Sequence, residues 1–320
     1  MIWLSWRQQR TETIITAALL ALLAAALIPP GIHLADAYRH DHVAACAGRA
    51  SQACQITVGT FAAGAGIIRG LAASGWFNVL PGLIGVALAT PFLLDLEHGT
   101  IRLAWTQSVT RSRWLSTKLG FAVLSAVLAG VAFSALFTWY RAPLDHVFGR
   151  FDTSTFDTEG TVPIAYTVFA LALAVMIGVL LRRAAAAIVV AFCAFVTARV
   201  FVDSWLRQRF VTPLEATWKF NAAGPNLTRA WVLSQQPSDK AGHPVGGNLV
   251  RILHCAHIEA HGSKVVDPTC LVRNGAGYTH AIWQPASRFW EFQGIETALF
   301  AGIALVLLAA AAAWLVRRAA

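Results

Sequence analysis

Six long apolar runs constrain the fold of this chain more than any other feature. They cover residues 13–34, 77–94, 119–140, 163–181, 184–202 and 297–316. A bilayer with a hydrocarbon core about 30 Å thick needs roughly 20 apolar residues for each helical span. Arg182 and Arg183 separate the fourth run from the fifth, and one helix through both would be about 60 Å long, twice that core. The sequence therefore predicts an all-α integral membrane protein with six transmembrane helices and a tight turn at the arginine pair.

The basic residues near these runs predict how the chain is oriented. With 57% hydrophobic and 13% charged residues, the composition is unlike that of a soluble domain of this length. One predicted face collects short, basic flanks, whose members are Arg7, Arg10, Arg102, Arg111, Arg113, Lys118, Arg182, Arg183, Arg317 and Arg318. Because cytoplasmic flanks are enriched in Lys and Arg, both termini are expected on the cytoplasmic side.

The expected domain organisation is one transmembrane permease domain over residues 1–320, with a large extracellular loop between spans five and six. This insertion, residues 204–295, is rich in Gly, Pro, Asn and Trp. We expect it to form a small cap, pinned by a disulfide, with a few helical fragments.

Four of the five cysteines fall in two pairs within predicted outer loops. Cys46 and Cys54 lie in the first loop, Cys255 and Cys270 lie in the last, and Cys193 lies in the fifth apolar run. Pairs of cysteines on an extracellular face are typical of disulfides. We expect the disulfides Cys46–Cys54 and Cys255–Cys270, with free thiols as the alternative.

The amino-terminal apolar run has two interpretations. Arginines before the run and the small residues of "ADA" at 35–37 are compatible with a signal peptide. The run is at the long end for a signal peptide, however, and Trp3, Trp6, Arg7 and Arg10 suit an interfacial helix. An uncleaved first span is the favoured interpretation.

The segment "WQPASRFWEFQGIE", residues 283–296, leads into the last span. We expect Pro285 to open a helix there. The predicted outer interfacial residues are Trp283, Arg288, Trp290, Glu291 and Glu296, with Arg288 and Glu291 spaced to pair. Aromatic residues favour the headgroup boundary, so the segment is interpreted as an anchor. A gate or a substrate-entry role is the alternative.

The sequence contains few motifs that indicate catalysis. None of the four lysines follows a glycine or precedes Ser or Thr, so the chain lacks a phosphate-binding loop of the ATPase type. His254, His257 and His261 are the candidate metal ligands, because three imidazoles on one helical face can hold zinc. An exposed polar helix is the favoured interpretation, and we expect no catalytic, cofactor-binding or metal site. Arg199 and Asp203, four residues apart, are expected to form a local salt bridge, with a proton relay as the alternative. The spread of basic charge does not indicate nucleic-acid binding.

The stretch "DLEHGTIRLAWTQSVTRSRW", residues 95–114, predicts a short polar helix between spans two and three. Gly99 allows a sharp exit from the second span, and Thr100 is a plausible amino-terminal cap with Asp95 and Glu97 just before it. Such a helix is too short to be stable alone. It needs the lipid headgroups or a protein partner.

This stretch resembles the cytoplasmic loop after the second span in ATP-binding-cassette (ABC) exporter permeases of the type-2 family. About 24 residues carry the resemblance, and the matching positions are Glu97, Gly99, Thr100, Leu103, Val109, Thr110, Arg111 and Lys118. The chain departs from the family pattern at Ser108, where proline is usual, and at Trp105 and Gln107. Together with "WQPASRFW", the stretch also resembles an actinobacterial-like subgroup of this family.

The resemblance implies a coupling helix that seats in a groove of a separate ATPase subunit. The implied ATPase-coupling residues are Glu97, Gly99, Thr100, Leu103, Trp105, Thr110 and Arg111. It further implies two permease copies, or one with a paralogue, in a bacterial plasma membrane. Two ATPase subunits would hold the ATP and Mg, so this chain would bind no cofactor while exporting a hydrophobic or amphipathic substrate. The alternatives are a metal-dependent enzyme that uses the histidine loop, and a membrane sensor or scaffold.

Overall fold

The structure is a computed structural model that divides into two compact units. The described residues are 2–46, 51–64, 75–99, 110–151, 153–220, 222–244, 256–258, 264–266, 268–273, 275 and 277–318. The first unit comprises Met1–Arg207 and Trp290–Ala320, and the second comprises Gln208–Phe289. We call them the helical unit and the sheet unit, and describe each by itself.

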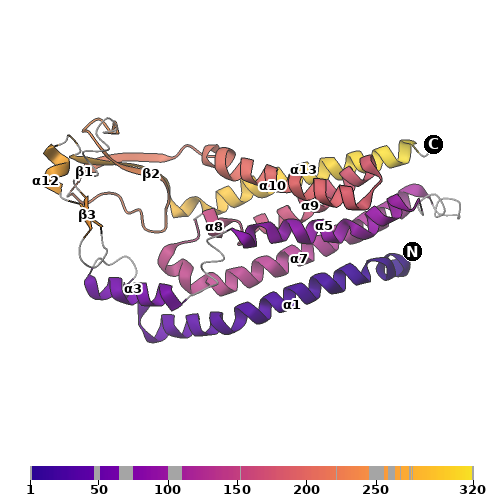
Figure 1. Ribbon diagram of the computed structural model, residues 1–320, viewed down its shortest axis with the longest axis horizontal. Coiled ribbons are helices and arrows are strands. Elements are labelled where there is room, and N and C mark those ends of the chain that lie inside the picture. The colour runs from indigo at the N-terminus through magenta and orange to yellow at the C-terminus, as the bar shows by residue number, and fades with distance from the viewer. Residues whose placement is uncertain are drawn as a thin grey trace. The chain divides into compact units, whose positions relative to one another are not determined.

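Among the described residues, six helices are long and apolar enough to cross a membrane. They are α1 (Ile2–His40), α5 (Trp76–Glu97), α7 (Arg111–Phe148), α9 (Val162–Leu181), α10 (Ala184–Phe201) and α13 (Phe289–Arg318) (Figure 1). Each contains most of one predicted apolar run. Several helices extend well beyond these runs, because polar flanking residues continue the helical hydrogen bonding that an apolar window cannot detect. These helices define an integral membrane protein.

Helix α9 lies at the centre of the helical unit and packs against α5, α7 and α10. Close backbone approach explains two glycines at these contacts. A Cβ added to Gly85 of α5 would lie 2.2 Å from the Thr167 carbonyl oxygen of α9, and one added to Gly178 of α9 would lie 2.2 Å from Leu93 of α5. Small residues at these positions let the two helices approach closely, as is usual where helices pack in lipid.

The chain reverses direction at the arginine pair between α9 and α10. Arg182 adopts a left-handed conformation with φ 53°, and its N–H donates to the Gly178 carbonyl at 2.8 Å. Arg183 is extended, and α10 begins at the next residue. The predicted tight turn is therefore present, and α9 and α10 form a helical hairpin.

In the described part of the helical unit, three shorter α-helices lie between the long ones: α2 (Val43–Cys46), α3 (Gln52–Gly64) and α8 (Thr153–Phe156). Phe61 of α3 packs with Leu34, Val43, Leu144 and Val147 in one buried cluster. The predicted Cys46–Cys54 disulfide joins α2 to α3. Cys270 is also disulfide-bonded, but Cys255 lies outside the described residues, so its pairing with Cys270 stays a prediction. Cys193 is a free thiol.

The sheet unit contains an antiparallel sheet that the sequence analysis did not predict. Its described strands are β1 (Leu214–Lys219), β2 (Trp231–Ser238) and β5 (Tyr278–Gln284), in the order β1-β5-β2. The remaining described elements of this unit are η2 (Arg207–Arg209, whose first residue belongs to the helical unit), β3 (Ala256–Ile258), β4 (Lys264–Val266), α12 (Pro268–Arg273) and η4 (Ala286–Arg288), and β3 pairs with β4. The register pairs Leu214 with Trp283, far apart in the chain. A local hydrophobic pattern does not reveal such pairing, which is why only helical fragments were expected.

Candidate functional site

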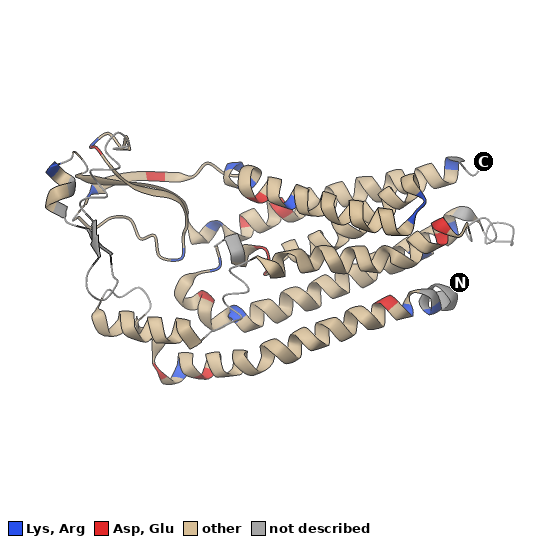
Figure 2. Cartoon of the chain, viewed as in Figure 1, with Lys and Arg blue, Asp and Glu red and all other residues tan. Residues whose placement is uncertain are grey.

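One end of the helical unit holds Glu97, Gly99, Thr110 and Arg111, which are the described residues among those that the resemblance assigns to ATPase coupling. The end of α5, the start of α7, the α9–α10 turn and both chain termini lie together there (Figure 1). In Figure 2 several of these helix ends carry blue segments, which mark lysine and arginine positions. We call this the basic end of the helical unit.

Glu97, the last residue of α5, holds the start of α10. Its Oε2 atom accepts a hydrogen bond from the Ala184 backbone N–H at 3.0 Å. The first N–H groups of a helix have no partner inside the helix and carry a partial positive charge, so a carboxylate there is favourable. Glu97 therefore caps α10 from a different helix.

A second contact at the basic end joins α5 to α7. Lys118 of α7 forms an ion pair with Asp95 of α5. The Lys118 ammonium also lies 4.8 Å from the centroid of the Trp114 ring. Together with the Glu97 cap, this ion pair fastens the end of α5 to two other helices. Neither partnership is predictable from the local sequence, since nothing near residue 97 indicates that it contacts residue 184.

The predicted coupling residues are only partly described. Gly99 has φ +69°, a left-handed conformation that suits the predicted sharp exit from α5. Thr110 is extended and directly precedes α7, whose first residue is Arg111. Thr100, Leu103 and Trp105 lie outside the described residues, so the coupling helix itself stays a prediction.

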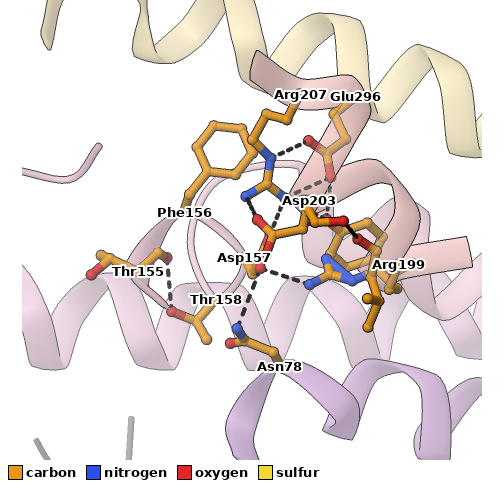
Figure 3. Close-up of polar contacts among 12 residues, drawn as sticks. Asn78, Thr155, Phe156, Asp157, Thr158, Arg199, Asp203, Arg207 and Glu296 are labelled. Atoms are coloured by element: carbon orange, nitrogen blue, oxygen red, sulfur yellow. Dashed lines mark hydrogen bonds and ion pairs between the residues drawn. The ribbon is translucent and has the colours of Figure 1, made fainter. Parts of the chain in front are cut away.

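The opposite end of the helical unit holds a buried ionic cluster, shown in Figure 3. Its centre is Asp157, in the connection between α7 and α9. The Asp157 carboxylate accepts hydrogen bonds from Arg199 at 2.6 Å, Arg207 at 2.5 Å, Tyr166 at 3.1 Å and Asn78 at 3.3 Å. Burial alone raises the pKa of Asp157, but the charges of Arg199 and Arg207 outweigh burial and hold that pKa below its usual value.

Arg207 completes this cluster from the end of the α10 segment, after the π-helical turn η1 (Val202–Leu206). It donates to both carboxylate oxygens of Glu296 on α13, at 2.8 and 2.9 Å, and to Asp203 at 2.6 Å. Tyr166 of α9 also hydrogen-bonds Glu296. The cluster therefore links α5, α9, α10, α13 and the α7–α9 connection. Buried charges are costly unless they are paired, as they are here.

The expected local salt bridge between Arg199 and Asp203 is wrong. Arg199 pairs with Asp157, and Asp203 pairs with Arg207. The i,i+4 spacing permitted the local pair, but the buried Asp157 gives Arg199 a partner that the α10 sequence alone does not indicate.

A glutamine on α13 fixes the start of α9. The Oε1 atom of Gln293 accepts hydrogen bonds from the N–H groups of Thr161 and Val162, each at 3.0 Å, and its Nε2 atom donates to the Phe156 carbonyl at 2.9 Å. Gly160 has φ +72°, and a Cβ there would lie 2.6 Å from Gln293 Oε1. The α7–α9 connection is thus held by side chains as well as by its own backbone.

The five predicted interfacial residues do not share one environment. In the sheet unit, Trp283 is buried in β5, and Arg288 donates to the Thr212 carbonyl and to Gln284, at 2.8 and 2.7 Å, rather than to Glu291. In the helical unit, Trp290 and Glu291 are exposed, whereas Glu296 is fully buried in the ionic cluster. The helix turn η4 begins directly after Pro285. Glu296 lies five residues after Glu291, so the helical period turns it toward the interior.

The candidate histidine site falls mostly outside the described residues. Among the described residues, no group of three or more His, Cys, Asp or Glu side chains is arranged to hold a metal ion. His257 lies in strand β3, not in a helix. His254 and His261 lie outside the described residues.

The helices and the buried ionic cluster place the chain in the class of multi-pass membrane proteins. A family model described as "ABC-2 membrane transporter related" matches residues 17–207, which is more than half of the 320 residues. The chain therefore belongs to the ABC-2 membrane transporter related family, as the resemblance implied. Membership indicates the membrane subunit of a transporter, a kind of protein that in general associates with an ABC ATPase subunit. The chain matches no curated protein and no solved structure significantly.

Proposed function

We propose that this chain is the membrane-spanning half of an ABC exporter driven by a separate cytoplasmic ATPase. Two copies, or one copy and a paralogous permease, would assemble with two ATPase subunits that hold the ATP and Mg. The observation that carries this proposal is the family match across residues 17–207. Export of a hydrophobic or amphipathic substrate, the bacterial plasma membrane and the actinobacterial-like subgroup follow from the sequence resemblance.

The proposed orientation puts the basic end in the cytoplasm and the sheet unit outside the cell. Arg182 and Arg183 lie between α9 and α10, and Arg317 lies in the last turn of α13. Short cytoplasmic segments next to membrane spans are enriched in such positive charges. The buried ionic cluster then belongs to the outer end of the helices. The Cys46–Cys54 disulfide, in the first connection, faces the oxidising side.

The contacts at the basic end support a mechanism for coupling. In this proposal the segment after Glu97 seats on the ATPase, and closure of the two ATPases moves it. Glu97 passes the movement to α10 through Ala184, and Asp95 passes it to α7 through Lys118. The two helices α7 and α10 are then displaced together, because separating either charge from its partner costs free energy.

Variants of Glu97 test this proposal. The chain should be purified together with its ABC ATPase subunit, and substrate-stimulated ATP hydrolysis and co-purification should be measured in lipid. Glu97→Ala is expected to lower stimulated hydrolysis about tenfold or more while insertion stays normal, since losing a cap costs only about 1 kcal/mol. Glu97→Gln keeps an acceptor for the Ala184 N–H and should retain more coupling.

A matched control separates coupling from general damage. Glu291 is an exposed acid like Glu97 but lies on α13 near the other end of the helical unit. Glu291→Ala should couple like the wild type. The proposal fails if Glu97→Ala also couples normally, or if both substitutions reduce coupling equally. Purified without its ATPase, the chain should hydrolyse no ATP, because no lysine lies in a phosphate-binding loop.

A further inference from the structure

A second charged group lies beside the buried ionic cluster and has no part in it. Glu159, in the α7–α9 connection, is 3.0 Å from Arg141 Nε through Oε1 and 3.0 Å from Arg150 Nε through Oε2. Asp145 of α7 contacts the same two nitrogen atoms, at 3.5 Å from Arg141 and 3.7 Å from Arg150. The two carboxyl groups therefore face the same pair of guanidinium groups.

These carboxyl groups are buried and incompletely hydrogen-bonded. The Glu159 side chain is 0% exposed and that of Asp145 is 8% exposed. Glu159 Oε1, Asp145 Oδ1 and Arg141 Nε form no hydrogen bond with any described residue, so the contacts of Arg141 are charge contacts without hydrogen-bond geometry. The Asp145 carboxyl is within hydrogen-bonding reach of the Glu159 carboxyl. Two buried oxygens that each lack a donor thus lie on neighbouring carboxyl groups.

We propose that Asp145 and Glu159 form a proton-binding site in which one proton is shared between the two carboxyl groups. A hydrogen on Glu159 Oε1, donated to Asp145 Oδ1, would give both of these oxygens a hydrogen bond. The proton comes from bulk water and returns to it, so no other reactant is needed. Like charges this close disfavour full ionisation, and the pair then titrates as a unit.

The surrounding charged groups do not cancel the repulsion between the Asp145 and Glu159 carboxylates. Arg141 and Arg150 supply two positive charges, but the Arg150 side chain is 30% exposed and also lies over the Trp290 ring of α13 at 5.5 Å. Solvent therefore screens part of the charge of Arg150. Other titratable groups nearby are engaged elsewhere: His146 stacks on Tyr38 of α1, Asp157 pairs with Arg199 and Arg207, and Glu296 pairs with Arg207.

Burial and the charge of Asp145 raise the pKa of Glu159 to about 8, from a usual value of 4.5. The folded protein therefore holds a proton that the unfolded chain has already released above that usual value. Proton binding to the folded state stabilises it, so stability is expected to fall as the pH rises from about 4.5 to about 8. Occupancy of the site would thus decide how firmly the α7–α9 connection is held against α7.

Infrared difference spectroscopy on the full chain in lipid nanodiscs tests the site directly. Spectra taken at about pH 6 and about pH 9, on either side of the titration, should differ by the carbonyl band of a protonated carboxylic acid. Glu159→Gln and Asp145→Asn should each abolish that difference band. Asp203→Asn changes a carboxylate outside the pair and should leave the band intact.

The wild-type spectrum decides the proposal even if a variant fails to fold. Absence of a pH-dependent carboxyl band in the wild type would overturn the shared proton. So would a band that persists in both folded variants, or one that is lost in Asp203→Asn alone. As a second measurement, the fall in melting temperature between about pH 6 and about pH 9 should be smaller in Glu159→Gln than in the wild type. These measurements need no ATPase, so their outcome is independent of the proposed transport function.

Discussion

Arg207 and Glu296 form a bidentate ion pair in which Nε meets Oε2 at 2.8 Å and Nη2 meets Oε1 at 2.9 Å. Both side chains are essentially inaccessible to solvent. The pair joins the end of the α10 segment to the last helix, 89 residues further along the chain. Because Arg207 also binds Asp157, one guanidinium group holds three segments of the helical unit together.

Removing Arg207 should strongly destabilise the helical unit. Arg207→Met leaves the Glu296 carboxylate buried without its guanidinium partner, and breaking a buried pair typically costs about 3–5 kcal/mol. The measurement is thermal unfolding of the purified protein in lipid. Arg10→Met removes an exposed arginine of α1 and should change stability by less than about 0.5 kcal/mol. Equal effects of the two substitutions would contradict the role assigned to Arg207.

Asp157 should give the protein a specific sensitivity to acid. The pKa of Asp157 in the folded protein lies below its usual value of 3.8. A lowered pKa means that the stabilisation is complete above that usual value and is lost as the pH falls through the folded pKa. We expect the wild-type melting temperature to drop below about pH 4.

The substitution Asp157→Asn isolates this contribution to acid sensitivity. It should lower the melting temperature at neutral pH and make the drop below about pH 4 shallower. An equally steep acid drop in Asp157→Asn would show that other carboxylates cause it.

Two glycine substitutions should have opposite effects. In Gly85→Ala the new methyl group would meet the Thr167 carbonyl at 2.2 Å, so α5 and α9 must separate. Overpacking of this kind costs about 1–3 kcal/mol. Gly120 of α7 has open space around it, and Gly120→Ala should stabilise the helix by about 0.5–1 kcal/mol. Thermal unfolding of both variants checks this, and a tolerated Gly85→Ala would mean that the two helices do not pack so closely.

Cysteine labelling in intact cells should establish the orientation of the chain. The background is Cys193→Ser with Cys255 and Cys270 also replaced by serine, which leaves only the Cys46–Cys54 disulfide. After a membrane-impermeant reductant, both remaining thiols should react with a membrane-impermeant maleimide. Labelling that occurs only after the cells are opened would place this disulfide in the cytoplasm and reverse the proposed orientation.

The sequence predicted the turn at the arginine pair and one disulfide, but it did not predict the partner of a buried charge. The arginine pair at 182 and 183 interrupts an apolar run too long for one span, so the turn between α9 and α10 was predictable from length alone. The Cys46–Cys54 disulfide was predictable from two cysteines close together in one loop. For Arg199 the nearest acid in the sequence was Asp203, but its actual partner is Asp157, 42 residues away. Spacing along the sequence shows which nearby residues could pair with a buried charge, but it does not show which residue does.

The sequence by itself determined the class of this protein, because the number and length of apolar runs are set by the thickness of a bilayer. It also determined the turn at the arginine pair and the family resemblance in residues 95–118. Only the tertiary structure decided that Glu97 caps α10, that Glu296 is buried against Arg207, and that Asp145 and Glu159 face the same two arginines. The physical reason is that a buried charge is stable only beside an opposite charge, and the packing of the helices determines which opposite charge lies next to it. Packing joins segments that lie far apart in the chain.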